Sequence, residues 1–459
     1  MSVLAGDALS VLRTLPDNSV QCIVTSPPYW ALRRYDIPDI VWDGDPACDH
    51  EWVSFVKPAK TGGLGNSFDY TANQVVPQQQ QQCSKCAAWM GQLGQEPTPE
   101  LFIRHMTDIF REARRVLRAD GTCWLNMGDC YSGVRGNTEA APGFDNKAAA
   151  GGADLFFAAD RRAPGLKNKD LGGIPWMLAF ALRADGWYLR AENIWAKGLS
   201  FCPSYAGSVM PESVTDRPTR SHEQVFLLTK SATYFYDHEA VKEKGVYQAG
   251  TRAAKGSGTR EGNWRGSPKQ DGTGNRRTTG FNERYFATDD EGYADDKRNM
   301  RTVWAIGVEL FTEAHFATYP PALVDPCLRA GTSQKGACAT CGAPWKRIVE
   351  YEPMPEEIKA QFEAARARTG DDHGRDDGFT TRRPNYVRKR IGETWQPTCE
   401  CGADVVPCTV LDPFAGSGTT GEVCELLRLR FIGIDLGYHE MSARRIGDVA
   451  PLFQSEQPA

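Results

Sequence analysis

The sequence has no apolar run long enough to cross a bilayer, and its first residues lack the basic and apolar regions of a secretory signal. Its longest apolar run, residues 174–182, is far shorter than the roughly 20 residues of a membrane-spanning helix. These absences exclude a membrane partner and an exported protein. We therefore expect a cytoplasmic protein.

An excess of positive charge is also missing, because 53 Lys and Arg face 58 Asp and Glu, for a net charge of −5. This balance excludes a surface that is basic overall, so contact with nucleic acid would need a local patch. Residues 242–284 are the candidate, since ten basic and four acidic residues lie there among many Gly, Ser, Thr and Asn. A solvated loop and a phosphate-contacting arm both fit this composition.

Cysteine is plentiful, with 14 residues in 459, and the lack of a secretion signal favours thiols and metal over disulfides. Two sets have the spacing of tetrahedral zinc sites. The candidate ligands are Cys48, His50, Cys83 and Cys86 in one set, and Cys338, Cys341, Cys399 and Cys401 in the other. The remaining seven are expected to be small core residues: Cys22, Cys123, Cys130, Cys202, Cys327, Cys408 and Cys424.

Short β-branched runs alternate with longer amphipathic runs along much of the chain, which predicts an α/β fold. Strands are expected at 3–4, 20–24, 187–195, 223–229 and 431–435, and within 121–129, where the strand ends in a polar turn; helices are expected at 8–15, 98–117, 175–184 and 422–429. Two regions depart from this pattern. In residues 46–95 the glutamine run 78–82 is typical of a linker, and the charged residues 350–395 predict a helix and a disordered stretch.

Two loops that follow predicted strands are candidates for chemistry. In Thr25-Ser-Pro-Pro-Tyr29, proline ends sheet pairing and stiffens the loop at a strand end, where open α/β sheets bind ligands. A stiff turn with aromatics in the core is the alternative there.

The second loop, 412–421, reads DPFAGSGTTG, and its glycines let backbone amides approach a ligand. The lysine that a Walker phosphate loop requires is absent. Asp435 ends the next strand about twenty residues on, where an acid suits ribose hydroxyls. The spacing predicts a nucleoside cofactor and leaves a dinucleotide open.

With these two loops the sequence resembles the amino-methylating DNA methyltransferases, which use S-adenosylmethionine. DPFAGSGT has the form of that family's cofactor motif, and TSPPY has the form of its catalytic motif. The catalytic motif comes first, as in the circularly permuted group called the beta class. Further matches lie at Gly6-Asp7, 192–197, 220–223 and 315–320. The resemblance implies a Rossmann-like methyltransferase fold in this permuted order. The two zinc-binding insertions expected from the cysteine spacing are not part of the family's minimal pattern.

The resemblance covers roughly residues 1–45, 98–240 and 300–450, and it suggests a division of the chain. We expect core segments at 1–45, 98–240, 301–333 and 409–459, zinc-binding insertions at 46–97 and 334–408, and a target-recognition region at 241–300. The last region includes the basic residues noted above.

The resemblance also implies roles for individual residues. In that family the target base is flipped out of the duplex and stacks on the aromatic of the catalytic loop. Tyr29 would be this platform, Ser26 Oγ and the Pro27 carbonyl would accept from the amine, and Pro28 would help to stiffen the loop. The residues implied to bind the cofactor are Asp7, Thr318, Pro320, Asp412, Phe414, Gly416, Gly418 and Asp435.

The implied substrate is double-stranded DNA, methylated at N4 of cytosine, since Ser ahead of the two prolines is commoner in that family with cytosine than with adenine. Methylation of adenine N6 is the alternative, because one acceptor can serve either amine. An inactive zinc-containing DNA-binding protein is a further alternative, and RNA stays open. Protein glutamine methylation uses a similar loop but the reverse motif order.

A cognate restriction enzyme would be a partner, and we expect the protein in a prokaryote or a phage. The sequence does not indicate whether such an enzyme is present. It also does not give the target sequence or the oligomeric state.

Overall fold

The computed structural model describes residues 1–32, 34–55, 80–132, 165–202, 204, 205, 207, 209, 212, 214–244, 297–309, 318–369 and 390–454. Most of the predicted recognition region, 245–296, lies outside these residues. Contacts divide the chain into a first unit (1–237, 301–345 and 397–459) and a second unit (238–300 and 346–396). Among the described residues, no helix combines the length and apolar character that a membrane span requires.

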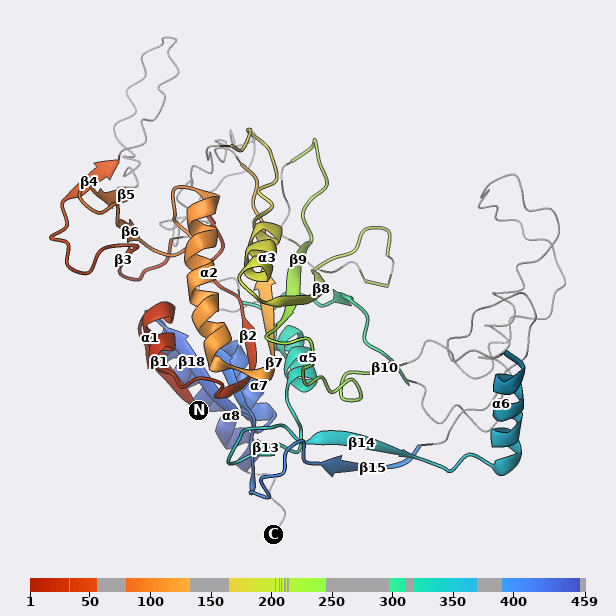
Figure 1. Ribbon diagram of the computed structural model, residues 1–459. Helices are drawn as coiled ribbons and strands as arrows, with labels where there is room; N and C mark the ends of the chain where they lie inside the picture. The colour runs from red at the N-terminus through yellow and green to blue at the C-terminus, as the bar shows by residue number, and fades with distance from the viewer. Residues whose placement is uncertain are drawn as a thin grey trace, which may run out of the picture. The chain divides into compact units, whose positions relative to one another are not determined.

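An eight-stranded sheet forms the centre of the first unit (Figure 1). In spatial order its strands are β1 (Ser2–Ala5), β18 (Arg430–Asp435), β17 (Thr409–Asp412), β2 (Val20–Thr25), β7 (Leu117–Met127), β9 (His222–Thr229), β8 (Tyr188–Ala196) and β12 (Val303–Ala305). All neighbours pair in parallel except where β9 meets β7 and β8. The late strands β17 and β18 therefore lie between the early strands β1 and β2, which is the permuted order that the sequence predicts.

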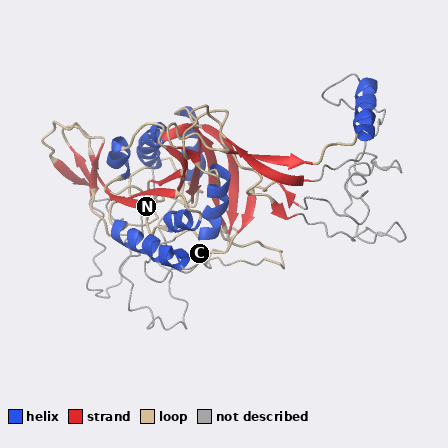
Figure 2. Ribbon diagram, turned by 90° about the horizontal axis from the view of Figure 1, so that it is seen from below, coloured by secondary structure: helices blue, strands red, loops and turns tan. Residues whose placement is uncertain are grey.

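Helices cover both faces of this sheet (Figures 1 and 2). One layer contains α1 (Ala8–Thr14), α2 (Pro99–Val116) and α3 (Ile174–Ala184), and the other contains α5 (Pro321–Gly331), α7 (Thr419–Leu426) and α8 (His439–Gln454). Helix α2 begins as expected, with the Thr98 side chain accepting from Leu101 N and Pro99 in the first turn. Its buried stripe, Phe102, Met106, Ile109 and Ala113, has helical spacing and packs into the core.

A smaller antiparallel sheet in the first unit has the order β3 (Ile40–Trp42), β6 (Trp89–Gly91), β5 (Gln80–Cys83) and β4 (Trp52–Phe55). The linker prediction for the glutamine run is therefore wrong for Gln80–Gln82, which pair with β4. A strand can contain these glutamines because its neighbours on both sides satisfy its backbone groups. A short pair, β13 (Ala337–Cys338) and β16 (Val405–Val406), also belongs to this unit.

The second unit contains the pair β10 (Glu243–Lys244) and β11 (Lys297–Arg298), the pair β14 (Lys346–Tyr351) and β15 (Arg390–Gln396), and α6 (Glu356–Thr369). Helix α6 confirms the helix expected within 350–395. The β14–β15 pair was not expected from its charged sequence. It is held across the strands by Arg347, which lies 2.8 Å from the Glu393 carboxylate and over the Trp395 ring.

Candidate active site

The two predicted loops meet at one pocket in the first unit. Strands β2 and β17 are neighbours in the sheet, so the loops that follow them, 25–29 and 412–418, emerge at the same edge. After β17 the chain continues to β18 on one side, and after β2 it continues to β7 on the other side. Open α/β sheets bind ligands between two neighbouring strands whose connections diverge in this way. The pocket is lined by the ends of β1, β2, β17 and β18, together with β3 and residues 318–319.

Several residues predicted from the sequence line this pocket: Asp7, Ser26, Pro28, Thr318, Phe414, Gly416 and Asp435. The other residues predicted for this site are not among those that line the pocket: Pro27, Tyr29, Pro320, Asp412 and Gly418. Asp7 accepts from Ser10 N at 2.9 Å as the N-cap of α1. Gly418 has a φ of 88°, and an added Cβ would lie 2.6 Å from Ser442 Oγ, so this turn requires glycine.

Asp435 joins the cofactor loop to the strand beside it. One carboxylate oxygen accepts from Gly416 N at 3.0 Å, and the other accepts from Gly437 N and Tyr438 N. These amides hold the carboxylate at the end of β18, where it lines the pocket. A carboxylate has capacity for further donors, so Asp435 can also accept from a ligand hydroxyl.

Asp412 is fully buried and connects four parts of the site. It accepts hydrogen bonds from the hydroxyls of Thr25 at 2.6 Å, Thr420 at 2.7 Å and Tyr319 at 2.9 Å, and from Phe414 N at 3.1 Å. Burial raises the pKa of this carboxyl, while the four hydrogen bonds oppose the rise. Asp412 thus fixes β2, the 412–418 loop and helix α7 relative to one another.

The 25–29 loop, which the sequence predicts to be catalytic, is held by a cluster of polar side chains. The Tyr29 hydroxyl donates to Glu223 Oε2 at 2.7 Å and lies 3.2 Å from Ser26 Oγ. The Asn126 amide donates to the Tyr29 hydroxyl at 2.8 Å and to Glu223 at 2.9 Å. Lys197 forms a further ion pair with Glu223. An added Cβ on Gly128 would lie 2.4 Å from the Tyr29 ring, so this glycine makes room for the aromatic.

The charges of this cluster follow from its burial. Burial raises the pKa of Glu223, but the charge and hydrogen bond of Lys197, with the bonds from Tyr29 and Asn126, outweigh it and hold that pKa below its ordinary value. Burial, and then the charge of Glu223, raise the pKa of Tyr29 well above its ordinary value. Tyr29 is therefore a neutral hydrogen-bond donor beside a charged carboxylate.

Among the described residues, the lining of the pocket contains two carboxylates and no basic side chain. The carboxylates are those of Asp7 and Asp435, and many of the other lining side chains are apolar. A nucleoside that carries a positive sulfonium fits this lining.

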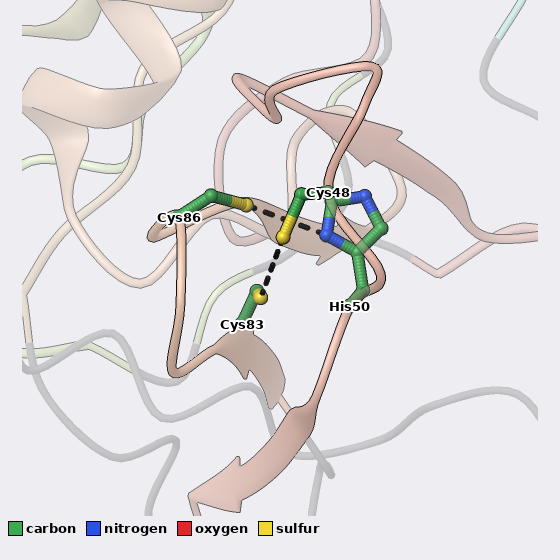
Figure 3. Close-up of side chains that lie close together, drawn as sticks. All are labelled: Cys48, His50, Cys83 and Cys86. Carbon is green, nitrogen blue, oxygen red and sulfur yellow. Dashed lines mark hydrogen bonds between the residues drawn. The ribbon is translucent and has the colours of Figure 1, made fainter.

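Each predicted cysteine set forms a cluster with its four ligand atoms within 4.8 Å of one another. In the first cluster, Cys48 Sγ lies 3.9 Å from Cys83 Sγ, and Cys86 Sγ lies 3.3 Å from His50 Nδ1 (Figure 3). Tetrahedral zinc with sulfur ligands at about 2.3 Å requires sulfur atoms roughly 3.8 Å apart. The donor set and its spacing fit zinc.

The seven cysteines outside these clusters are buried with one exception. Cys22, Cys123, Cys130, Cys327, Cys408 and Cys424 are core residues, as predicted. Cys202 is only partly buried, so the prediction of a core position is wrong for this residue. It lies in a loop after β8 rather than in a strand or helix.

The sequence alone predicts no role for Asn126, Lys197, Glu223 or Tyr319. Residues 192–197 and 220–223 match family motifs, which pointed to the segments that contain Lys197 and Glu223 but not to their contact with Tyr29. Tyr319 lies in the 315–320 match, of which 315–317 are outside the described residues. Asn126 pairs with Val225 on β9, so its role depends on sheet pairing across about 100 residues.

Comparison with known proteins gives consistent matches. A family model described as a DNA methylase, for N6 and N4 methyltransferases, matches residues 20–339 and 371–443. The Type II methyltransferase M.Cfr9I of Citrobacter freundii is 38% identical over 333 residues, which is 72% of each chain. The Type II methyltransferase M.SmaI of Serratia marcescens is 29% identical over 449 residues, 97% of this chain and 90% of that one.

Solved structures also align with this chain. The PvuII DNA methyltransferase, described as cytosine-N4-specific, covers 99% of this chain and 93% of its own at 12% identity, with a TM-score of 0.40. The M1.HpyAVI complex with SAM covers 97% and 98% at 11% identity, with a TM-score of 0.34.

Proposed function

Because the chain belongs to the N6/N4 DNA methylase family, and is thus a DNA amino-methyltransferase, we propose that it transfers a methyl group from S-adenosylmethionine to N4 of cytosine in double-stranded DNA. The observation that carries this proposal is the meeting of the Ser26–Tyr29 loop and the 412–418 loop at one pocket. A donor and an acceptor of the methyl group would need two such loops at one place.

The cofactor would supply an activated methyl group on a positively charged sulfur. Asp435 would accept from its ribose, and Asp7 would lie beside its adenine. Gly416 and Phe414 would line the pocket, while Thr318 and Pro320 would close it near the methionine end. Asp412 and Gly418 would hold the loop in shape from behind, since the first is wholly buried and the second takes a left-handed φ.

The exocyclic amine of a base is a weak nucleophile because its lone pair is delocalised into the ring. The enzyme would therefore have to hold the amine with its lone pair toward the methyl group. Ser26 Oγ and the Pro27 carbonyl would accept its two hydrogens, and Tyr29 would stack on the flipped base. Proline at 27 and 28 supports this role, because a fixed φ and the absent N–H keep the loop stiff.

The choice of cytosine N4 depends on Ser26. Ser ahead of the two prolines is commoner with cytosine in the resembling family. A hydroxyl can both accept from the amine and donate to the ring nitrogen beside it, whereas a carboxylate only accepts, although adenine offers the same pair of groups. Adenine N6 is the second candidate for the same site. DNA from an expressing host that lacks its own methylation, digested to nucleosides and analysed by mass spectrometry, is expected to contain N4-methylcytosine. N6-methyladenine in its place would refute Ser26 as a marker of cytosine, and the absence of both would refute the activity.

We further propose that each cysteine cluster holds one structural zinc ion, within insertions at 46–97 and 334–408. Four protein ligands leave no open position, and the proposed transfer needs no metal. Residues 241–300 are proposed to recognise the DNA target. A cognate restriction enzyme is proposed as the partner of this modification activity, as the Type II designation of the relatives suggests.

A further inference from the structure

The sheet that carries the first cysteine cluster also forms part of the pocket wall. Ile40 and Trp42 of β3, and Gln92 and Leu93 directly after β6, line the pocket beside the cofactor loop. These residues are adjacent to the cluster through backbone pairing: Trp42 pairs with Trp89 on β6, and Trp89 pairs with Gln82 on β5. The next residue on β5 is the ligand Cys83.

The cluster brings together two connections of this sheet, the one between β3 and β4 and the turn between β5 and β6. Cys83 ends β5 and Cys86 lies in the turn to β6, while Cys48 and His50 lie in the segment between β3 and β4 (Figure 3). A metal ion held by all four would thus fix the β3–β4 connection against the β5–β6 turn. Without it, the two segments would still be joined by Ser84 N, which donates to the Glu51 carbonyl at 2.9 Å, and by the Lys85–Glu51 ion pair at 2.8 Å, but no single bond would hold all four ligand side chains together.

Gln92 connects this sheet to another segment that lines the pocket, Tyr35 to Ile37. Its side chain is buried, with 2% exposed, and its amide donates to the Tyr35 carbonyl at 3.0 Å and the Ile37 carbonyl at 2.6 Å. Its oxygen accepts from Tyr35 N at 3.0 Å. Tyr35 and Ile37 both line the pocket, so one glutamine holds a whole segment of lining.

A second attachment joins the sheet to helix α2. The His105 ring lies 4.5 Å from the Trp42 ring with an interplanar angle of 20°, which is a stacked arrangement. Its two nitrogens lie 2.9 Å from Glu96 Oε1 and 2.9 Å from Asp43 Oδ2. His105 thus contacts Glu96 and Asp43 through its two nitrogens and Trp42 through one face of its ring. These contacts hold the Trp42 ring in its place in the pocket lining.

We propose that the metal at Cys48, His50, Cys83 and Cys86 organises the cofactor pocket through Trp42 and Gln92, so that its loss weakens cofactor binding. This inference rests on the proposed function for the identity of the ligand. The second cluster provides the contrast, because neither its ligands nor β13 and β16 contribute a residue to the pocket. Loss of its metal should leave cofactor affinity unchanged.

The test measures binding of S-adenosylhomocysteine, the demethylated cofactor, to the full chain by calorimetry, with zinc content measured on the same samples. Cys83→Ser should lose one zinc ion and bind at least about tenfold more weakly, because the pocket wall is no longer preorganised. Cys341→Ser should also lose one zinc ion and keep wild-type affinity. Wild-type affinity in a Cys83→Ser protein that has lost its zinc would overturn the proposal.

A second variant keeps the test decisive if Cys83→Ser does not fold. Gln92→Leu should retain both zinc ions and a wild-type circular dichroism spectrum, yet bind about tenfold more weakly. Gln82→Leu, on the exposed side of β5, is its matched control and should bind normally. Wild-type affinity of Gln92→Leu for S-adenosylhomocysteine would overturn this inference but leave the proposed function intact. Failure of the wild-type protein to bind S-adenosylhomocysteine would refute the proposed function.

Discussion

The hydroxyl of Tyr29 donates a hydrogen bond to Oε2 of Glu223 at 2.7 Å, across 194 positions of sequence. Glu223 lies near the start of β9, the one antiparallel strand of the large sheet, and Tyr29 lies in the loop after β2. The bond fixes the orientation of the aromatic ring in the catalytic loop. It gives Tyr29 two separable features, a ring face for stacking and a hydroxyl for anchorage.

Removal of the ring tests the stacking role. Tyr29→Ala is expected to lower the rate of methyl transfer about fivefold to 150-fold, because stacking of a base on an aromatic is worth about 1–3 kcal/mol. Transfer of a radiolabelled methyl group to DNA measures this rate. Binding of S-adenosylhomocysteine should not change, since Tyr29 stands outside the pocket lining. A wild-type rate in Tyr29→Ala would mean that the ring is only a core residue.

Removal of the anchor tests the contact with Glu223. Tyr29→Phe and Glu223→Gln should each lower the transfer rate less than Tyr29→Ala does, because the ring is kept. If Glu223 acts through the hydroxyl, the double variant should lose no more than the more affected single variant. Strictly additive losses would show that Glu223 acts on the reaction by another route.

Glu223 should also make stability depend on pH in acid. Its pKa is lowered in the folded chain from an ordinary value of 4.5, so the unfolded chain takes up a proton first as the pH falls. The stabilisation is therefore present above pH 4.5 and is lost as the pH falls through the folded value. Thermal melting of wild type and Glu223→Gln should differ by a constant amount above about pH 5.5, and the difference should shrink below that. A difference that grows in acid would contradict the assigned charge.

Much of the core could be predicted from the sequence because its signals are local. The strand before Ser26, the N-cap at Thr98 and the glycine loop before α7 each depend on residues close together in the chain. The Tyr29–Glu223 contact could not be predicted in this way, since it depends on β9 inserting in reverse beside β7. The strand at Gln80–Gln82 could not be predicted for a similar reason. It forms because these residues pair with β4, and not because glutamine itself favours a strand.

The position of Asp412 illustrates another limit. Its place in the glycine loop suggested contact with the cofactor, whereas the structure shows it buried under four hydrogen bonds. Motif spacing locates a loop but does not tell which side chains face the ligand. Asp435, in contrast, ends a strand at the pocket edge, where the alternation of the strand decides the direction of its side chain.

Asp435→Ala should weaken binding of S-adenosylhomocysteine at least about tenfold, because it removes an acceptor for ribose and three backbone contacts that shape the pocket. Calorimetry on the purified protein measures this change. Asp448→Ala, an exposed change on α8, is the matched control and should bind normally. Equal affinities of the two variants would show that the ribose does not lie at the end of β18.

Metal analysis of protein prepared without chelator should find close to two zinc ions per chain, one for each cluster of four ligands within 4.8 Å. His50→Ala and Cys399→Ser should each reduce this to about one, because each removes one of four ligands. A wild-type protein that contains no metal would refute both sites.

Deletion of residues 245–290 should abolish DNA binding and preserve cofactor binding. The basic residues of this segment would lose their contacts with phosphates, which supply most of the affinity of such a protein for DNA. None of the pocket-lining residues lies in the second unit, to which the segment belongs. The deletion can be closed with a short glycine-serine linker, since Lys244 and Lys297 are register partners on β10 and β11. Electrophoretic mobility shifts measure DNA binding, and calorimetry measures cofactor binding.

Loss of both DNA binding and cofactor binding would mean that the segment stabilises the core. Retention of DNA binding would mean that other residues recognise the target.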